Sequence, residues 1–334
     1  MSLQRFRPDN FTLTLLATVI LASLLPCRGE AARVFDGITD AAIALLFFLH
    51  GAKLPRAAIV QGIAHWRLHL TVLASTFVLF PLFGLALQPI GRAVLTPELY
   101  LGVLLVCALP STVQSSIAFT SIAGGNVSAA VVSASMSNLI GIVLTPLLVG
   151  VLLASHGEIG TSWRGVLDIV LQLLLPFVLG HLARRWIGDF VDRHKPLLGF
   201  TDQGTILLVV YTAFSAAVVE GLWRDTPISA LLCTLAVCAL LLALVMTTIR
   251  WIARRLGFRR KDEIAIVFCG SKKSMASGIP MARILFAGQL GGMGALVLPL
   301  IIFHQLQLMV CAVVARRYAA QGDHPIAQDS READ

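Results

Sequence analysis

Residues 270–280 read GSKKSMASGIP and lie inside an apolar block that runs from about residue 262 to residue 288. The glycines and the proline disfavour a continuous α-helix. Lys272 and Lys273 add two charges, and a charge at the bilayer centre costs about 2.5 to 3.5 kcal/mol on insertion scales. The stretch therefore predicts an interrupted membrane-spanning helix whose free backbone groups are buried in protein or line a wet cavity.

The whole chain has the composition of an integral membrane protein. Of 334 residues, 57% are apolar and 13% are charged, against about 25% charged residues in soluble domains. We predict an all-α polytopic fold with ten transmembrane helices of about 20 residues each, one transmembrane domain over residues 1–320 and a polar cytoplasmic tail over residues 321–334. The ten apolar blocks lie near residues 11–25, 34–51, 68–87, 98–123, 126–154, 166–187, 204–222, 228–253, 262–288 and 293–315.

The basic residues predict the orientation of these helices. If the N-terminus is cytoplasmic, most of the 26 lysines and arginines fall in the inner segments, as the positive-inside rule requires. After ten spans the C-terminus is then cytoplasmic as well. Because the charge alternates between loops, the net charge of +8 marks orientation and does not indicate a nucleic-acid partner.

The two halves of the chain carry the same irregularity. Five spans in each half force the second repeat, residues 166–318, to be inverted relative to the first, residues 11–154. A shift of 162 residues places PSTVQSS (residues 110–116) on the polar stretch of the second half. Two broken, crossing helices, the fourth and the ninth, are therefore predicted to form a binding site at the membrane midplane. The predicted helix-breaking residues are Pro110, Gly270, Gly278 and Pro280.

Polar residues around the two interruptions are the candidate ion-binding and substrate-binding groups. Any single serine is more simply explained as a small residue that lets helices pack closely. The clustering favours a site, because Asn126, Ser133 and Ser137 are spaced by seven and four residues and share one helix face. The predicted site residues are Ser111, Thr112, Gln114, Ser115, Ser116, Asn126, Ser133, Ser137, Lys272, Lys273, Ser274 and Ser277.

The two adjacent lysines are expected to point about 100° apart on a helix. One can then face the cavity while the other is paired or reaches water, and snorkelling to the interface is the alternative. The carboxylates available as partners within the apolar blocks are Asp36, Asp40 and Asp168. The sequence does not choose among them.

Signatures of enzyme chemistry are missing from the sequence. Five of the six cysteines lie in apolar blocks, with no CxxC pair and no histidine at metal-ligand spacing. No nucleophile with a base and no paired intramembrane carboxylates stand out either. We therefore predict a protein that is not an enzyme and has no cofactor, apart from an ion that could be coupled to transport.

The segment that begins at Pro110 resembles the bile acid:sodium symporter family, solute carrier family 10, whose fourth helix breaks at Pro-Gly-Gly-x-x-Ser-Asn. Pro110 and Ser115 match this motif, and Ser116 stands at the asparagine. The run from residue 268 to residue 286 is similar to the divergent branch that contains the orphan seventh mammalian member and its bacterial relatives. The resemblance covers nearly the whole chain, and it implies ten helices in a five-plus-five plan and a place in the inner (cell) membrane of a bacterium.

The resemblance also implies an ion site, with changes. In transporting members the ninth helix carries Glu-x-Gly-x-Gln-Asn, which binds sodium together with hydroxyls of the fourth and fifth helices. Here Phe268 replaces the glutamate, and Lys272 and Lys273 replace the glutamine and asparagine. A phenyl ring cannot ligate sodium and an ammonium repels it. We hypothesise that one lysine takes the place of a coupling cation, permanently or by gaining and losing a proton.

The implied function is a secondary active transporter, a symporter, of a small organic anion. Half-helix N-termini at the two interruptions favour an anion, as do the lysines. The coupling ion is left open between sodium, a proton and neither. A remaining sodium site would use Ser115, Ser116, Ser133 and Ser137. The alternative function is a non-transporting or proton-coupled membrane regulator of ion homeostasis.

Overall fold

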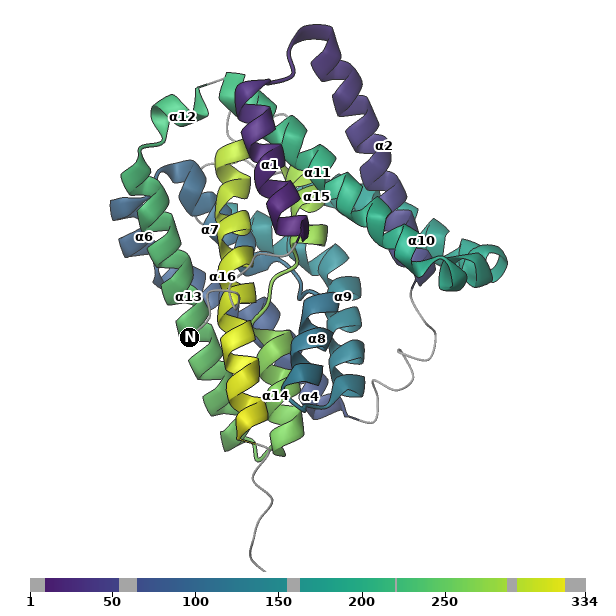
Figure 1. The fold of residues 1–334 in the computed structure, drawn as a ribbon, viewed down its shortest axis with the longest axis vertical. Coiled ribbons are helices and arrows are strands. Elements are labelled where there is room, and N and C mark those ends of the chain that lie inside the picture. Colours follow the sequence, from purple (N-terminus) through teal and green to yellow (C-terminus); the bar gives the residue numbers. More distant parts are fainter. Residues whose placement is uncertain (1–9, 54–64, 155–162, 220, 287–292, 322–334) are drawn as a thin grey trace, which may run out of the picture.

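The computed structural model of the protein describes residues 10–53, 65–154, 163–219, 221–286 and 293–321, and every regular element in these ranges is a helix (Figure 1). The predicted all-α fold is therefore confirmed. All but the first residue of the predicted tail lies outside the described residues. The helices are α1 (Asn10–Leu24), α2 (Gly29–Lys53), α4 (Trp66–Ala74), η2 (Ser75–Leu79), α5 (Phe80–Ala86), α6 (Gln88–Val94), α7 (Pro97–Ala108), α8 (Gln114–Ile122), α9 (Val127–Ala154), α10 (Trp163–Arg193), α11 (Lys195–Val219), α12 (Leu222–Asp225), α13 (Ile228–Arg255), α14 (Arg260–Gly270), α15 (Met275–Leu285) and α16 (Met293–Ala320).

Each predicted apolar block corresponds to one helix or to one set of consecutive helices. Within the described ranges, five helices are long and apolar enough to cross a membrane by length and composition. Shorter apolar helices cover residues 13–24 and 97–108. The five long spans are Trp66–Ala86, Val127–Leu152, Leu198–Val219, Ile228–Arg255 and Met293–Ala320.

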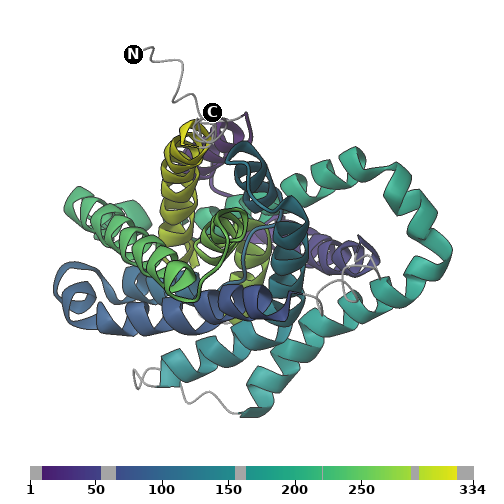
Figure 2. The same cartoon turned by 90° about the horizontal axis from the view of Figure 1, so that it is seen from below.

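The helices form two groups that meet along a cavity. In the first group α2 packs against α10 and α11, and α1 packs against α11 (Figure 1). In the second group α7 packs against α16, while α14 contacts α4, α8, α9 and α13. Seen from below, α10 and α11 (teal) reach outward from the rest of the body (Figure 2). We call the first group the panel and the second group the core.

Two glycines allow α2 and α10 to cross at close range. A Cβ atom at Gly51 of α2 would collide with the main-chain carbonyl of Phe177, and one at Gly180 of α10 would collide with that of Phe48. Small residues serve this purpose in membrane helices, because backbones that approach closely gain packing energy that lipid cannot supply. The panel therefore depends on the missing side chains at this crossing.

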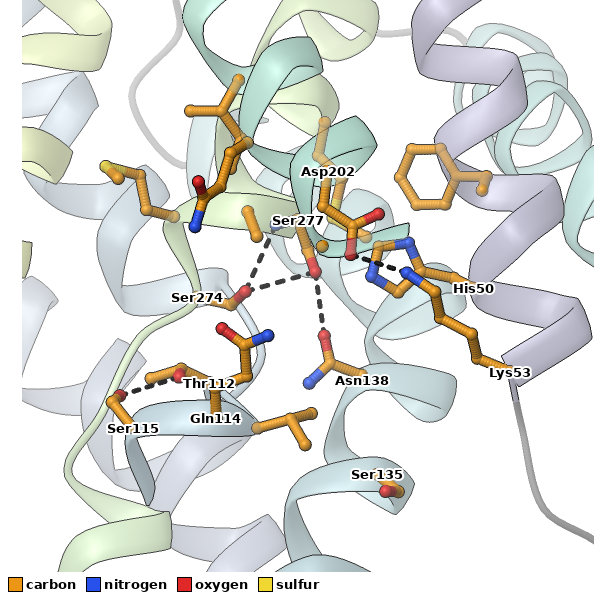
Figure 3. Close-up of a pocket in the computed structure, with 18 of the residues that line it drawn as sticks. His50, Lys53, Thr112, Gln114, Ser115, Ser135, Asn138, Asp202, Ser274 and Ser277 are labelled. Carbon is orange, nitrogen blue, oxygen red and sulfur yellow. Dashed lines mark hydrogen bonds and ion pairs between the residues drawn. The ribbon is translucent and has the colours of Figure 1, made fainter. Parts of the chain in front are cut away.

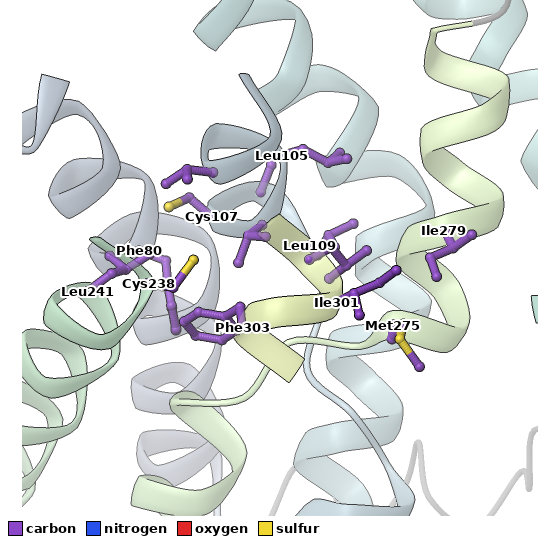
Figure 4. Packing of buried hydrophobic residues seen from close by; sticks show 14 of the residues in the cluster. Phe80, Leu105, Cys107, Leu109, Cys238, Leu241, Met275, Ile279, Ile301 and Phe303 are labelled. Carbon is purple, nitrogen blue, oxygen red and sulfur yellow. The ribbon is translucent and has the colours of Figure 1, made fainter. Parts of the chain in front are cut away.

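Both predicted interruptions are present, and the second is shorter than expected. The chain is open over residues 109–113, between α7 and α8, and over residues 271–274, between α14 and α15. The prediction that Gly278 and Pro280 break the helix is wrong, because α15 runs through both. Gly278 has a packing role instead, because a Cβ atom there would press into the side chain of Leu109. Leu109 belongs to the buried apolar cluster between the helices (Figure 4).

We expect Gly51→Ala to destabilise the protein by about 1 to 3 kcal/mol, the usual cost of overpacking, because the new methyl group meets backbone that cannot rotate away. Gly37→Ala in the same helix is the matched control, because a Cβ there meets nothing within 4 Å in the described part of the chain. Thermal unfolding of the purified variants in detergent measures the difference. Equal melting temperatures for the two variants would contradict the close crossing.

Candidate functional site

The two interruptions lie against each other and share hydrogen bonds. The Ser274 N–H donates to the carbonyl oxygen of Pro110 at 2.8 Å. In the other direction, the hydroxyl of Ser111 donates to the Cys269 carbonyl at 2.6 Å and that of Ser116 to the Phe268 carbonyl at 3.1 Å. Each open segment therefore satisfies backbone groups that the other has lost.

Helix α9 supplies a third set of partners from one side of the crossing. The Ser111 N–H donates to the Ser137 hydroxyl at 3.0 Å, and the Asn138 side-chain amide donates to the Ser111 carbonyl at 2.6 Å. The amide oxygen of Asn138 accepts from the hydroxyl of Ser277 at 2.8 Å. Asn138 thus connects the first interruption to the first turn of α15, although no pattern in the sequence marks it.

Lys273 holds the centre of the crossing. Its ammonium donates to three main-chain carbonyl oxygens, those of Thr76, Cys107 and Leu109. Its own backbone is held by the side-chain amide of Gln307, which accepts from the Lys273 N–H at 2.8 Å and donates to the Lys273 carbonyl at 2.9 Å. Lys273 is fully buried and does not line the cavity.

Lys272 is buried to the same extent but is bound differently. Its ammonium has no hydrogen-bond partner among the described residues, and it lies 3.8 Å from the centroid of the Phe119 ring. The expectation that one of the two lysines faces the cavity is therefore wrong for this conformation, since neither lines it.

The carboxylates proposed as lysine partners serve another cation. Arg283 of α15 forms ion pairs of 2.9 Å with both Asp36 and Asp40 of α2. Arg283 also donates to the hydroxyl of Thr212 in α11 at 3.1 Å. This cluster joins the core to the panel, so Asp36 and Asp40 are not available to the lysines. The side chain of Asp168 lies outside the described residues.

A cavity of about 520 Å³ lies between the panel and the core (Figure 3). On the core side, residues at the N-terminal ends of the two half-helices form the wall, namely Thr112, Val113, Gln114 and Ser115 at α8 and Ser274, Met275, Ala276 and Ser277 at α15. On the panel side, Lys53 forms an ion pair of 2.7 Å with Asp202, next to His50. The rest of the wall is mostly apolar, with Phe47, Leu139, Ile142, Phe177, Ile206 and Met281 among its residues.

The cavity gathers some of the predicted site residues and leaves others out. Those that line it are Thr112, Gln114, Ser115, Ser274 and Ser277. Those that do not are Ser111, Ser116, Asn126, Ser133, Ser137, Lys272 and Lys273. Polar lining residues that the sequence analysis left out of the site are His50, Lys53, Ser135, Asn138, Asp202, Gln203 and His304. Among the residues that the structure describes, Lys53 is the one lysine or arginine in the wall.

The four hydroxyls proposed for sodium have four separate protein partners. Ser116 and Ser137 hold backbone groups of the two interruptions. Ser115 shares a hydrogen bond of 2.9 Å with Thr112, and Ser133 one of 2.7 Å with the ring of His69. Sodium binding by these hydroxyls stays a prediction. Ser137 would have to share an oxygen that already accepts from the Ser111 N–H, whereas Ser116 donates its proton and keeps its oxygen lone pairs.

Asn126, also predicted for the site, lies at the start of α9. Its amide oxygen accepts from the Ala129 N–H at 3.0 Å, which is the hydrogen bond of a helix N-cap. Its amide nitrogen donates to Asp262 of the ninth span at 2.8 Å. These contacts give Asn126 a structural role in joining the two halves of the core.

We expect Asn138→Ala to lower the free energy of unfolding by about 1 to 3 kcal/mol, because it leaves the buried Ser111 carbonyl without its amide donor. Ser135→Ala is the matched control, since Ser135 lines the same cavity one turn earlier on α9. Urea or thermal unfolding in detergent measures both. An Asn138→Ala variant as stable as Ser135→Ala would show that Asn138 does not hold the crossing together.

Known proteins resemble this chain over nearly its full length. The chain is 58% identical over 326 residues to an Escherichia coli protein named "Putative symporter YfeH", covering 98% of this chain and 97% of that one. It is 28% identical over 318 residues to sodium/bile acid cotransporter 7 of Rattus norvegicus, covering 93% of each. An uncharacterized protein of Pseudomonas aeruginosa is 62% identical over 325 residues, with 97% and 96% coverage.

The match to a family model covers every helix that the structure describes. Residues 9–320 match the model of the SBF-like CPA transporter family. The resemblance to bile acid:sodium symporters and to the branch of their seventh mammalian member, inferred from Pro110–Ser116 and residues 268–286, is confirmed by these relatives. The chain belongs to the SBF-like CPA transporter family.

Proposed function

We propose that the protein is a secondary active transporter of a small organic anion. The observation that carries this proposal is the cavity, which is lined by the N-terminal residues of two half-helices, α8 from the first half of the chain and α15 from the second. The N-terminal end of a helix carries a partial positive charge and free N–H groups, which together bind anions. The mostly apolar wall suits a substrate whose body is apolar and whose charge lies at one end.

Lys53 adds a full positive charge from the panel. It faces the half-helix N-termini across the cavity, and in this conformation Asp202 neutralises it at 2.7 Å (Figure 3). We propose that a bound anion competes with Asp202 for Lys53. The panel then contributes to substrate selection, while the core supplies the two N-termini.

We propose that transport proceeds by alternating access in a ten-span protein whose two five-helix repeats are inverted, with both termini cytoplasmic, in the inner membrane of a bacterium. The matching positions of the two interruptions, 162 residues apart, support the repeat. The Arg283 cluster supports the alternation, because it joins core and panel near the first half of α2, whereas Lys53 lies at the end of the same helix. Ion pairs that join core and panel near the first half of α2, with the cavity against the last turns of the same helix, suit a protein that opens to one side at a time.

We propose further that sodium is not the coupling ion. Phe268 and the two lysines stand at the family's ligand positions, and the oxygen of Ser137 already accepts from the Ser111 N–H. These side chains support a transporter that is coupled to a proton or to no ion at all. The alternative function is a membrane regulator of ion homeostasis that transports nothing. The uptake measurement below distinguishes this regulator from a transporter.

We expect the melting temperature of the protein in detergent to be the same in sodium, potassium and choline chloride at equal ionic strength. An ion that binds only the folded state must raise stability in a saturable way, by mass action. The titration is repeated between about pH 6 and pH 9, so that an effect of sodium that depends on a bound proton is detected as well. A saturable rise that is specific to sodium would overturn the proposal and restore the family's coupling ion.

We expect proteoliposomes that contain the protein to accumulate radiolabelled amphipathic carboxylates or sulfates. We expect Lys53→Gln to lower kcat/KM for these anions about tenfold or more, which is the usual effect of losing a hydrogen bond to a charged group. Lys261→Gln is the matched control, since Lys261 is an exposed lysine at the start of α14, away from the cavity. Uptake that Lys53→Gln leaves unchanged would remove Lys53 from substrate binding. No uptake of any anion by folded protein would favour the regulator.

A further inference from the structure

The ammonium of Lys273 sits in a cage of main-chain carbonyl oxygens at the end of α7. Nζ lies 2.8 Å from the oxygen of Thr76, 2.8 Å from that of Cys107 and 2.7 Å from that of Leu109. The ring of Phe80 covers the group, with its centroid 4.1 Å from Nζ. Because an ammonium has three N–H donors, the three carbonyls satisfy it completely.

The cage exists because two of these carbonyls have lost their helical donors. For Cys107, the residue three positions later is Pro110, which has no N–H. The residue four positions later is Ser111, whose N–H donates to the hydroxyl of Ser137 at 3.0 Å. The Cys107 carbonyl at the end of α7 would therefore stay unpaired without the lysine.

The Thr76 carbonyl is free for a related reason. Thr76 lies in the π-helical turn η2, in which a carbonyl pairs with the N–H five residues later. That residue is Pro81, which has none, and the N–H of Phe80 donates to the Ser75 carbonyl instead. The π-turn and Pro81 thus leave the Thr76 carbonyl without a helical donor, and it accepts from the ammonium of Lys273 next to the end of α7.

This environment is that of a site for a free monovalent cation. Carbonyl oxygens at the C-terminal end of a half-helix replace the hydration shell of alkali ions, and an aromatic face adds attraction for any cation. We infer that the carbonyls of Thr76, Cys107 and Leu109 form a monovalent-cation site that Lys273 fills with a tethered ammonium, and that a shortened side chain opens this site to a free cation. The inference gives a structural basis for the proposed sodium independence, but its test does not require transport.

Lys272 provides the internal comparison. It is the adjacent residue, it is equally buried, and it also lies against an aromatic ring, that of Phe119. Its ammonium has no carbonyl cage among the described residues. Removing either lysine removes one buried charge, so a difference between the two variants reports on the carbonyl cage.

The test compares Lys273→Ala, Lys272→Ala and the unaltered protein in detergent. We expect Lys273→Ala to lower the melting temperature by roughly 10 °C, because three buried carbonyls lose their donor. Methylammonium or ethylammonium chloride should then raise it in a saturable way, as a ligand of the folded state does. Choline at equal ionic strength should not, because its quaternary nitrogen has no N–H. The unaltered protein and Lys272→Ala should show no saturable effect of any of these cations.

The inference is wrong if folded Lys273→Ala responds to no ammonium or alkali cation, or if all three proteins respond alike.

If Lys273→Ala does not fold, a second measurement uses Lys273→Gln as its reference variant, because glutamine keeps two N–H donors. Lysine ¹⁵N NMR is practicable because the chain has only five lysines. We expect a solvent-protected –NH₃⁺ signal in the unaltered protein that is missing in Lys273→Gln. A neutral amine signal in its place would overturn the inference, because –NH₂ cannot donate to three carbonyls. Failure of the uptake assay would leave both of these outcomes unaffected.

Discussion

The constraint on which this structure depends is that backbone groups released by a broken helix find partners inside the protein, because lipid offers none. At the end of α7 the carbonyls of Ala108, Pro110 and Ser111 accept from Thr145, Ser274 and Asn138. At the end of α14 the carbonyls of Phe268 and Cys269 accept from Ser116 of α8 and from Ser111 of the first interruption. The two breaks are therefore stable only together, and the crossing fixes the place of the cavity.

The same constraint explains why several residues that look like ion ligands are structural. Hydroxyls near a helix break are the simplest donors for unpaired carbonyls, and Ser111, Ser116 and Thr145 all serve in that way. A sodium site and a satisfied helix break need the same residue types at the same places. The choice between them depends on where the neighbouring chain lies, which no local pattern contains.

The sequence predicted the interruptions well and their contacts poorly. Proline and the lysine-rich stretch break a helical pattern locally, so Pro110 and Gly270 were placed correctly, whereas Gly278 was misplaced because a glycine that permits close packing looks the same as one that ends a helix. Carboxylates were the natural partners to expect for the lysines. The carbonyls that Lys273 meets are 164 to 197 residues away along the chain, and a carbonyl belongs to every residue type. Lys53 and Asp202 were missed as site residues because charges near helix ends normally mark the membrane interface.

The lysines of the core and of the panel have different roles. In the core, the ammonium of Lys273 is bound by backbone oxygens and shielded from the cavity, so it stabilises the crossing without attracting a substrate. In the panel, Lys53 and Asp202 keep 26% and 18% of their side-chain surface exposed and lie in the cavity wall. A partner that is exposed can be exchanged for a ligand, whereas a buried cage cannot be opened without losing all of its hydrogen bonds. Selectivity for the proposed anion is therefore expected to differ among relatives through residues of the panel, whereas the carbonyl cage around Lys273 is expected wherever the two interruptions cross in this way.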